Sequence, residues 1–374
     1  MDKKKKLRIA AFGCRHLPPK DGSAGEDKFA VELYPRIAEL GHQVIVYTRI
    51  YSTNISVKGK YKNVCTIGLR TVRNSGLDTL LHSFLCTFHI ILNNTADIVH
   101  IHNGGNSIWA LMLRLFGKKV VVSQDGVDWK RDKWPWYGKL YLKLSSFITA
   151  YLPNEVVFDN VFAKDIFEKK FNKKYKMIEY GTNFIDHDIQ SSILSKFGLQ
   201  PYEYFLFIGR FIPDKGVHYL IEAFKKIKTN KKLILVGGSP NKDNYEFYLK
   251  HLAENNSQII FTGFIYGDDV NKLIQNAYVY IQPSDVEGLS PVILQVMGIG
   301  TPLICSNIQE NLYIVKDDAV HFKKGNASSL AEKLNYVQQH PLEINKKAKY
   351  GQSRIRKEYN WDSVTQKYIK IFQN

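Results

Sequence analysis

The most constraining feature of this sequence is a regular alternation of short apolar runs with longer amphipathic stretches. The runs at 7–13, 43–49 and 97–102 have the length and β-branched content of strands, and the stretches at 27–40 and 77–92 have helical periodicity. Alternation of this kind predicts strand-helix-strand units, which form a parallel sheet with helices on both faces. We therefore expect an α/β chain of the doubly wound, Rossmann-like kind.

The alternation occurs as two series, which predicts two domains. The chain has 374 residues, and a chain of this length usually folds around two hydrophobic cores and not around a single one. The first series continues with strands expected at 119–124, 155–158 and 176–180 and helices at 107–116 and 137–151. The second has strands expected at 204–210, 232–237, 258–263, 278–282 and 302–306 and helices at 217–227, 245–254, 268–276 and 291–298.

A polar, non-periodic stretch separates the two series. We expect an N-terminal Rossmann-like domain at 1–185, a linker at 186–200 and a second Rossmann-like domain at 201–355. The chain ends with three helical patterns, at 328–339, 343–359 and 361–372. We expect no strands between or after them. The last segment, 356–374, is expected to cross back to the N-terminal domain.

Charge is the most unusual aspect of the composition. The chain has 52 Lys and Arg against 35 Asp and Glu, a formal net charge of +17, which attracts nucleic acid, anionic lipid or phosphorylated small molecules. Many lysines, such as Lys225 and Lys226, follow the pattern of solvated helix faces. Attraction to a membrane surface and a simple solvated surface are both open interpretations.

Cysteine usage and hydropathy limit the class of protein further. The four cysteines have no paired spacing, which argues against a disulfide framework or a structural zinc site and favours thiols packed in the core. No apolar run reaches the roughly 18 residues of a membrane helix, and the start lacks the features of a signal peptide. We expect a cytoplasmic protein.

Two segments of the second series carry the clearest chemical signal. In the first, Gly209 to Gly216, a strand end meets a helix start, and Arg210 and Lys215 flank the turn. A guanidinium and an ammonium there can hold a diphosphate and stabilise it as a leaving group, because ligands collect at the carboxyl ends of strands in such sheets. A surface turn with chance charges is the alternative interpretation.

The second segment, Pro283 to Gln295, has the same arrangement of strand end, turn and helix start. Glu287 lies at its turn, and Gln295 follows about two helical turns later, a separation that suits contacts to different parts of one extended ligand. A carboxylate that stabilises the positive end of the helix dipole explains Glu287 equally well.

These motifs together resemble the family-four retaining glycosyltransferases of the GT-B fold. The resemblance rests on the order Gly-Arg-x-x-x-x-Lys-Gly, Glu-Gly-x-Ser and Met-Gly-x-Gly-Thr-Pro, beginning at Gly209, Glu287 and Met297. It implies two Rossmann-like domains facing across a cleft. The N-terminal half is similar to a rhamnosyltransferase-like branch, through its long Gly-rich loop, the stretch 29–49 and the stretch 125–134.

The resemblance implies roles for residues that match the family's motifs. Arg210 and Lys215 correspond to its diphosphate-binding pair, and Glu287 to the first carboxylate of its paired-Glu motif, near the donor sugar. Gln295 stands where the family has a second Glu that binds the nucleotide ribose, which makes a deoxyribose donor such as a dTDP-sugar more favourable. The implied donor site also includes Gly209, Gly288, Leu289 and Ser290.

Candidates in the first series are less specific. The loop residues Gly22, Ser23, Ala24 and Gly25 precede a helix and are expected to bind a phosphate or the acceptor, or to be a flexible loop. Asp125 stands where many family members have a His facing the donor sugar. It is expected to orient a sugar hydroxyl, to act as a base or to cap a helix.

A pair of histidines and a basic aromatic stretch complete the candidates. His100 and His102 alternate on one strand, and packed or hydrogen-bonded rings are favoured over a metal site because further ligands are missing. The stretch after Asp125 is expected to face the acceptor or an anionic membrane, and its position argues against a nucleic-acid partner. Its candidate residues are Asp128, Trp129, Lys130, Arg131 and Trp134.

The sequence therefore predicts a hexosyltransferase that works without a metal or another cofactor, since cationic side chains stabilise the leaving group. The donor is a dTDP-, UDP- or GDP-sugar. The transferred group is hexosyl or deoxyhexosyl, and rhamnosyl is one candidate. The acceptor is a saccharide or lipid-linked saccharide of a surface polysaccharide, with peripheral association at the inner face of the membrane. Two alternatives are a nucleotide-sugar epimerase of the same fold and a non-catalytic basic protein that binds nucleic acid or membrane.

Overall fold

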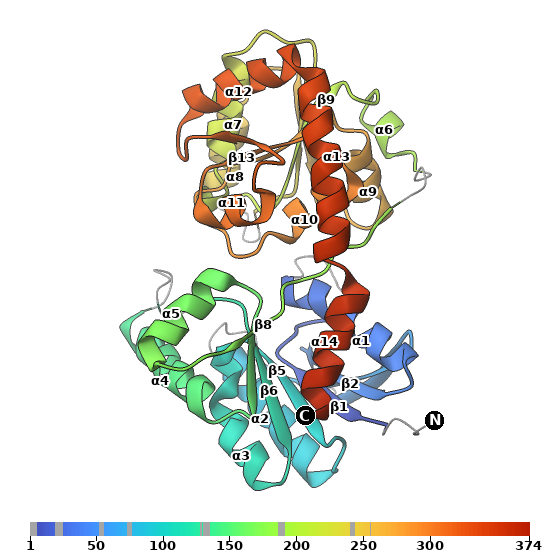
Figure 1. The fold of residues 1–374 in the computed structure, drawn as a ribbon, viewed down its shortest axis with the longest axis vertical. Coiled ribbons are helices and arrows are strands. Elements are labelled where there is room, and N and C mark those ends of the chain that lie inside the picture. Colours follow the sequence, from blue (N-terminus) through green and yellow to red (C-terminus); the bar gives the residue numbers. More distant parts are fainter. Residues whose placement is uncertain are drawn as a thin grey trace. The chain divides into compact units, whose positions relative to one another are not determined.

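A computed structural model describes residues 6–18, 25–51, 56–72, 77–127, 129, 135–185, 191–239, 244–254 and 256–374. The chain forms two compact units, each with its own sheet (Figure 1). Unit 1 comprises Met1–Tyr180 and Trp361–Asn374, and unit 2 comprises Gly181–Asn360. The boundaries between the units lie a few residues from the expected boundaries at 185 and 355. The last helix belongs to unit 1.

Unit 1 contains a mostly parallel sheet in the order β3-β4-β2-β1-β5-β6-β7-β8. Only β3 and β4 pair antiparallel among its described strands. The chain starts in the middle, moves outward through β2, and then crosses to the other side of β1 with β5. The strands are β1 Arg8–Phe12, β2 Gln43–Ile50, β3 Ser56–Tyr61, β4 Val64–Arg70, β5 Ile98–His102, β6 Lys119–Gln124, β7 Glu155–Phe158 and β8 Lys176–Met177.

Helices cover both faces of this sheet, as the alternation of side chains along β1 shows. Ile9 and Ala11 pack in one cluster with α1 and the C-terminal helix α14, whereas Ala10 and Phe12 pack on the opposite face with α2 and α3. The helices are α1 Gly25–Glu39, α2 Leu77–Leu92, the 3-10 helix η1 Gly104–Trp109, α3 Ala110–Leu115, α4 Trp136–Tyr151, α5 Val161–Phe171 and α14 Trp361–Gln373. Because β1 is buried on both faces, its sequence is a nearly continuous apolar run.

Unit 2 contains a parallel sheet in the order β11-β10-β9-β12-β13-β14. As in unit 1, the chain moves outward from the first strand and then crosses to its other side, so the strand order reverses between β9 and β12. The strands are β9 Tyr204–Ile208, β10 Lys232–Val236, β11 Ile259–Gly263, β12 Val279–Gln282, β13 Leu303–Ser306 and β14 Val320–Phe322.

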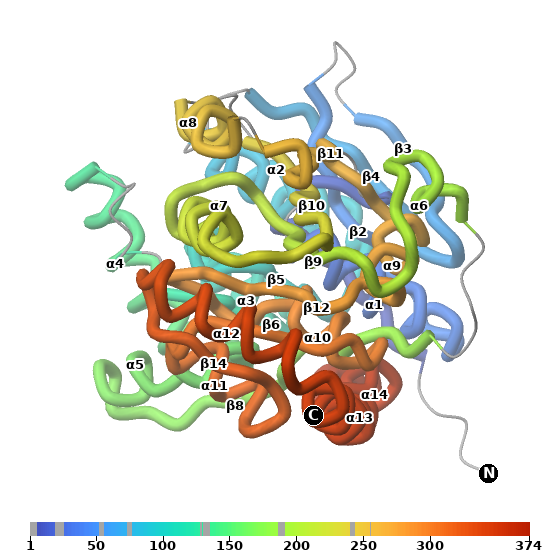
Figure 2. The backbone as a smooth tube through the Cα atoms, turned by 90° about the horizontal axis from the view of Figure 1, so that it is seen from above, coloured from blue at the N-terminus to red at the C-terminus, as the bar shows by residue number. Residues whose placement is uncertain are grey.

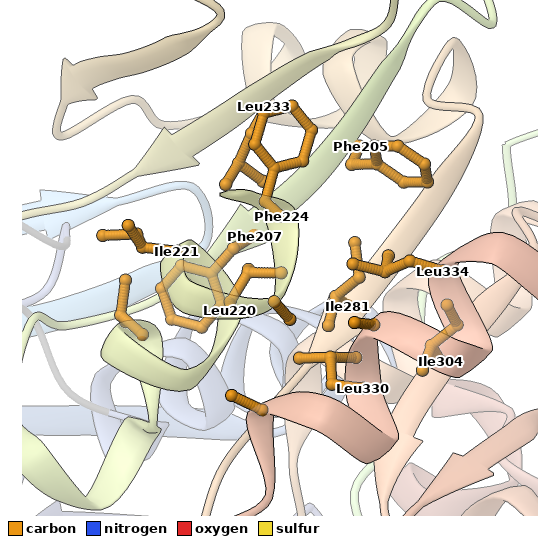
Figure 3. Close-up of a cluster of buried hydrophobic side chains, with 14 of the residues drawn as sticks. Phe205, Phe207, Leu220, Ile221, Phe224, Leu233, Ile281, Ile304, Leu330 and Leu334 are labelled. Atoms are coloured by element: carbon orange, nitrogen blue, oxygen red, sulfur yellow. The ribbon is translucent and has the colours of Figure 1, made fainter. Parts of the chain in front are cut away.

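One face of this sheet packs against α7 and α12, and Figure 3 shows the core between them. Phe205 and Phe207 of β9 point into this cluster, whereas the side chain of Tyr204 lies on the opposite face and donates a hydrogen bond to the Leu273 carbonyl of α9. The helices are α6 Ile193–Lys196, the 3-10 helix η3 Pro213–Lys215, α7 Val217–Lys225, α8 Asn244–Leu252, α9 Asp268–Gln275, α10 Pro291–Ile299, α11 Gln309–Val315, α12 Ala327–Gln339 and α13 Pro341–Glu358.

The sequence did not predict seven of these elements: β3, β4, α5, α6, η3, α11 and β14. Strand β3 carries exposed side chains along almost its whole length, so it has no apolar periodicity to detect. The start of α5 did have a signal, since Asn160 caps it by accepting hydrogen bonds from the Phe162 and Ala163 amides. The expected helix 107–116 is η1 followed by α3.

Two further expectations differ from the structure. The segment expected as a linker contains α6, and Ile193 and Leu199 are buried, so its described part packs within unit 2. Cys65 is exposed, whereas Cys14, Cys86 and Cys305 are buried as expected. Cys65 lies on β4 in the hairpin with β3, whose own side chains are exposed along almost its whole length. Among the described helices, none is long and apolar enough to cross a bilayer.

Candidate functional site

The two chemical motifs of the second series lie side by side at the carboxyl ends of β9 and β12. These strands are neighbours, paired through Phe205 with Val279 and Leu206 with Tyr280. The order of the sheet reverses between them. Ligands of doubly wound sheets bind outside the carboxyl ends of the strands at such a reversal.

Backbone contacts bring the turn after β9 against the turn after β12. Gly216 ends η3 with φ 64°, and a Cβ at this position would lie 2.2 Å from the Pro283 carbonyl oxygen. Next to it, the Asp285 amide donates a hydrogen bond of 2.8 Å to the Asp214 carbonyl. A side chain at position 216 would separate the two turns, so the glycine of the motif has a packing reason.

Lys215 and Glu287, predicted separately as site residues, form an ion pair. Lys215 Nζ lies 2.6 Å from Glu287 Oε1, and the Glu287 side chain is only 7% exposed. The ammonium is therefore held at the reversal point by a carboxylate from the neighbouring turn. A buried carboxylate needs such compensation, because desolvation of an unpaired charge is costly.

Glu287 Oε1 accepts two further hydrogen bonds that orient the carboxylate. Gln282 Nε2 and Ser284 Oγ each donate at 2.6 Å, and both residues are buried. Tyr280 OH in turn donates to Gln282 Oε1 at 2.5 Å. Among the described residues, no donor to Glu287 Oε2 occurs, so this oxygen is the one available to a ligand.

Arg210 differs from Lys215 in having no partner for its guanidinium among the described residues. Its side chain is exposed, while the next residue, Phe211, is buried at 1% exposure and anchors the turn. Beside it, the amide of Phe211 donates to the Gly238 carbonyl after β10. An exposed guanidinium next to an anchored turn is suited to a bidentate interaction with a phosphate.

The start of α10 contributes backbone groups and one amide side chain. Ser290 caps the helix, its hydroxyl accepting a long hydrogen bond of 3.5 Å from the Ile293 amide, and Pro291 occupies the first turn. Gly288 and Leu289 lie in the turn that leads into this cap. Gln295 is half-buried, and its amide nitrogen donates to Asn271 Oδ1 of α9.

The sequence analysis did not single out the turn after β10. Gly237 has φ 133°, and a Cβ there would lie 1.8 Å from the Gly209 carbonyl oxygen, so the turns after β9 and β10 are in direct backbone contact. Ser239 follows with a buried hydroxyl that has no hydrogen-bond partner in the described structure. The signal was present as two adjacent glycines after a strand.

The candidates of the first series are only partly described. Seven of them lie outside the described residues: Gly22, Ser23, Ala24, Asp128, Lys130, Arg131 and Trp134. Gly25 is the first residue of α1.

Trp129 is buried and does not face an acceptor or a membrane. Its ring packs on Phe167 with centroids 5.1 Å apart, and Lys170 Nζ lies 4.1 Å from the ring centroid. Asp125 follows β6 directly and is half-buried.

His100 and His102 are buried and hydrogen-bonded, as the sequence analysis favoured. Tyr34 OH lies 2.9 Å from His100 Nδ1 and 2.5 Å from His102 Nε2. His100 Nε2 also lies 2.7 Å from Ser123 Oγ. Burial lowers the pKa of His102 to about 3 and that of His100 well below its usual value, so both rings are neutral at pH 7.

Comparison with known proteins agrees with this architecture. Residues 192–355 match the family described as Glycosyl transferases group 1. The uncharacterized glycosyltransferase MJ1607 of Methanocaldococcus jannaschii is 29% identical over 217 residues, which are 54% of this chain and 54% of that protein. The match thus spans about half the length of this relative. The residues that match the family lie within unit 2.

Solved structures match over nearly the whole chain. Sucrose-phosphate synthase from Thermosynechococcus elongatus is similar with a TM-score of 0.83 and 18% identity, covering 98% of both chains. Anabaena Alr3699/HepE in complex with UDP-glucose has a TM-score of 0.79 and 13% identity, covering 98% of this chain and 99% of that one. The chain has the GT-B fold, which confirms the predicted fold class.

Proposed function

We propose that this protein transfers a hexosyl or deoxyhexosyl group from a nucleotide-sugar to a saccharide or lipid-linked saccharide. The observation that carries the proposal is the convergence of Arg210, Lys215 and Glu287 at the strand reversal of unit 2. The Arg210 guanidinium, which has no partner in the described part of the chain, and the Lys215 ammonium supply the positive charge that a departing nucleoside diphosphate needs. Glu287 places one free carboxylate oxygen where a donor sugar can be bound.

These side chains also supply what a metal ion would provide in other transferases, so we expect turnover without one. Retention of configuration, a rhamnosyl group and a role in surface polysaccharide synthesis follow from the family resemblance alone. In a retaining reaction of this type, the diphosphate can accept the acceptor's proton while Arg210 and Lys215 hold it. Full activity in the presence of EDTA is the expected result for a metal-independent enzyme.

Association with a membrane is part of the proposal, and helix α4 supports it. One face of α4 is buried through Leu142, Ser145 and Thr149, whereas the opposite face exposes large apolar side chains. These are Trp136, Tyr137, Leu140, Leu144, Phe147 and Tyr151, which are 44% to 78% exposed. In Figure 2, α4 projects from the edge of unit 1. Lys143 adds a positive charge on the exposed side.

A screen of thermal stability with UDP, GDP and dTDP tests the donor site. A ligand that binds only the native state stabilises it by a free energy that grows with the logarithm of the ligand's excess over the dissociation constant, so at least one nucleotide should raise the unfolding temperature. Absence of binding to all three would favour the non-catalytic protein. Conversion of the nucleotide-sugar without any acceptor would favour the epimerase.

A further inference from the structure

Unit 1 contains a small cavity at the carboxyl ends of β5, β6 and β7, next to its own strand reversal. Its lining includes His102 and Ser123 from the strands, Asp125 and Asp159 from the residues that follow them, and Glu26 from α1. The cavity measures about 10 Å³, space for about one water-sized group. Sequence analysis singled out Asp125 but not Asp159.

Asp159 is the least expected of these residues. It is 9% exposed, and its Oδ1 is buried without a hydrogen-bond partner in the described structure. Its carboxyl group is hydrogen-bonded by Tyr180. Burial, and then the charge of Asp125, raise the pKa of Asp159 to about 8, so this carboxyl carries a proton at pH 7.

Among the described residues, no cation offsets the charge of Asp159. Asp125 and Glu179 both act on it with negative charge, and Tyr180 is a phenol whose pKa burial raises well above its usual value. Tyr368 of α14 lies on the cavity wall with its pKa raised by burial. His102 on the opposite wall is neutral.

Several other polar groups of the wall are already engaged. Ser123 Oγ lies 2.7 Å from His100 Nε2 and 3.0 Å from Tyr368 OH, and His102 is bonded to Tyr34. The Oδ1 atom of Asp159, without a partner in the described structure, is one polar atom of the wall that a ligand can complete. A neutral carboxylic acid in a desolvated position is a hydrogen-bond donor, which suits a neutral ligand with an acceptor oxygen and not a cation or a phosphate.

We propose that Asp159, with Asp125, binds one hydroxyl or hydroxymethyl group of a sugar in this cavity, and that Asp159 acts there as a hydrogen-bond donor. The aromatic rings of Phe29 and Tyr180, with centroids 5.0 Å apart, form the apolar part of the same wall. This inference rests on the proposed function, because it requires a sugar substrate. The sugar comes from the donor or from the acceptor, and the experiment separates the two sources.

The first arm uses UDP and UDP-glucose as calorimetric probes with the full chain. If the donor sugar enters the cavity, Asp159→Ala should reduce the preference for UDP-glucose over UDP about tenfold, because a buried hydrogen bond is lost. Asp159→Asn should keep the preference within about threefold, since an amide still donates. Binding of UDP itself should not change. Asp165→Asn on α5, an exposed aspartate, is the matched control.

The second arm uses free glucose and rhamnose, observed by saturation-transfer NMR in the presence of UDP. If the acceptor sugar enters the cavity, the signal of at least one sugar should be lost in Asp159→Ala and kept in Asp159→Asn. Failure of UDP, GDP and dTDP all to bind the wild type would remove the proposed function, whereas this arm, repeated without a nucleotide, would still test the cavity. Unchanged results in both arms, with a folded Asp159→Ala variant, would overturn the inference.

The pH dependence separates a donor role from a merely structural one. Asp159 donates only while protonated, so sugar binding by the wild type should weaken as the pH rises through about 8. The Asp159→Asn variant carries no titrating proton and should keep its sugar binding up to pH 9. Identical pH profiles for wild type and Asp159→Asn would show that Asp159 does not act as a donor.

Discussion

The two units have the same winding, yet they concentrate opposite chemistry at their strand reversals. In unit 2, Arg210 and Lys215 bring two cations to the ends of β9 and β12. In unit 1, Asp125 and Asp159 bring two carboxyl groups to the cavity beyond β6 and β7. The same sheet topology thus provides a position, and local residues decide whether it suits a phosphate or a hydroxyl group.

The units also differ in how their polar groups are compensated. The carboxylate of Glu287 is stabilised as a charge by a lysine and two neutral donors. In the described part of the chain, no cation acts on the carboxyl of Asp159, and burial favours its protonated form. Burial of an acid therefore has two outcomes in one chain, and the partner decides which one occurs.

The largest effect is expected from the cations of unit 2. Arg210→Ala and Lys215→Ala should each lower turnover by about two to three orders of magnitude, because preorganised charge is removed from a leaving group. Stability should change little in Arg210→Ala, whereas Lys215→Ala should also lower it, because Glu287 loses its cation. Steady-state kinetics measures the effect, and Lys228→Ala, an exposed lysine beyond α7, is the control. Wild-type turnover in both variants would remove the diphosphate site.

In unit 1, the pH dependence of stability should reveal the proton on Asp159. The folded pKa of about 8 lies above the usual 3.8, so the native state binds the extra proton. The stabilisation is complete below about pH 4 and is lost as the pH rises through 8, by up to about 1.4 kcal/mol per pH unit.

Asp159→Asn removes this titration. Its free energy of unfolding, from urea denaturation at pH 5 and pH 9, should rise relative to that of the wild type as the pH increases. Asp165→Asn should show no such trend. An equal pH dependence of wild type and Asp159→Asn would contradict a protonated Asp159 and weaken the contrast between the units.

A smaller effect is expected at Gln295, which bonds to Asn271. If Gln295 faces the nucleotide's sugar, Gln295→Glu should favour UDP over dTDP by at most about 1.5 to 3 kcal/mol, the strength of a charge-assisted hydrogen bond to ribose. Asn271 can donate to the new carboxylate, so the fold should tolerate the change. An unchanged UDP-to-dTDP affinity ratio in calorimetry would show that Gln295 does not bind the ribose.

The smallest effect concerns the surface of unit 1. The wild type should sediment with anionic vesicles in a salt-sensitive manner, and Lys143→Ala should weaken this by about 1 kcal/mol, the contribution of one basic residue near such a surface. Lys228→Ala in unit 2 should not change it. Equal sedimentation with neutral and anionic vesicles would rule out charge-directed association through α4.

Sequence periodicity was sufficient for most strands of both sheets and for the position of the candidate residues in unit 2, whose roles stay a prediction. Strands with two buried faces, such as β1 and β9, are apolar runs that can be recognised without a structure. Arg210, Lys215 and Glu287 stand in turns beside those runs, and neighbouring parallel strands end on the same edge of a sheet. The hairpin of β3 with β4 was missed because exposed strands carry no apolar pattern.

Tertiary structure alone decided the rest. One cavity is lined by Asp159, Tyr180 and Tyr368. Tyr368 lies more than 180 residues from the other two, and no spacing in the sequence predicts that they meet. Trp129 looked like a surface residue among basic neighbours, but the ring of Phe167 buries it. Local patterns determine which segments form strands and helices, whereas the protonation of Asp159 depends on desolvation and on charges that only the packed fold brings together.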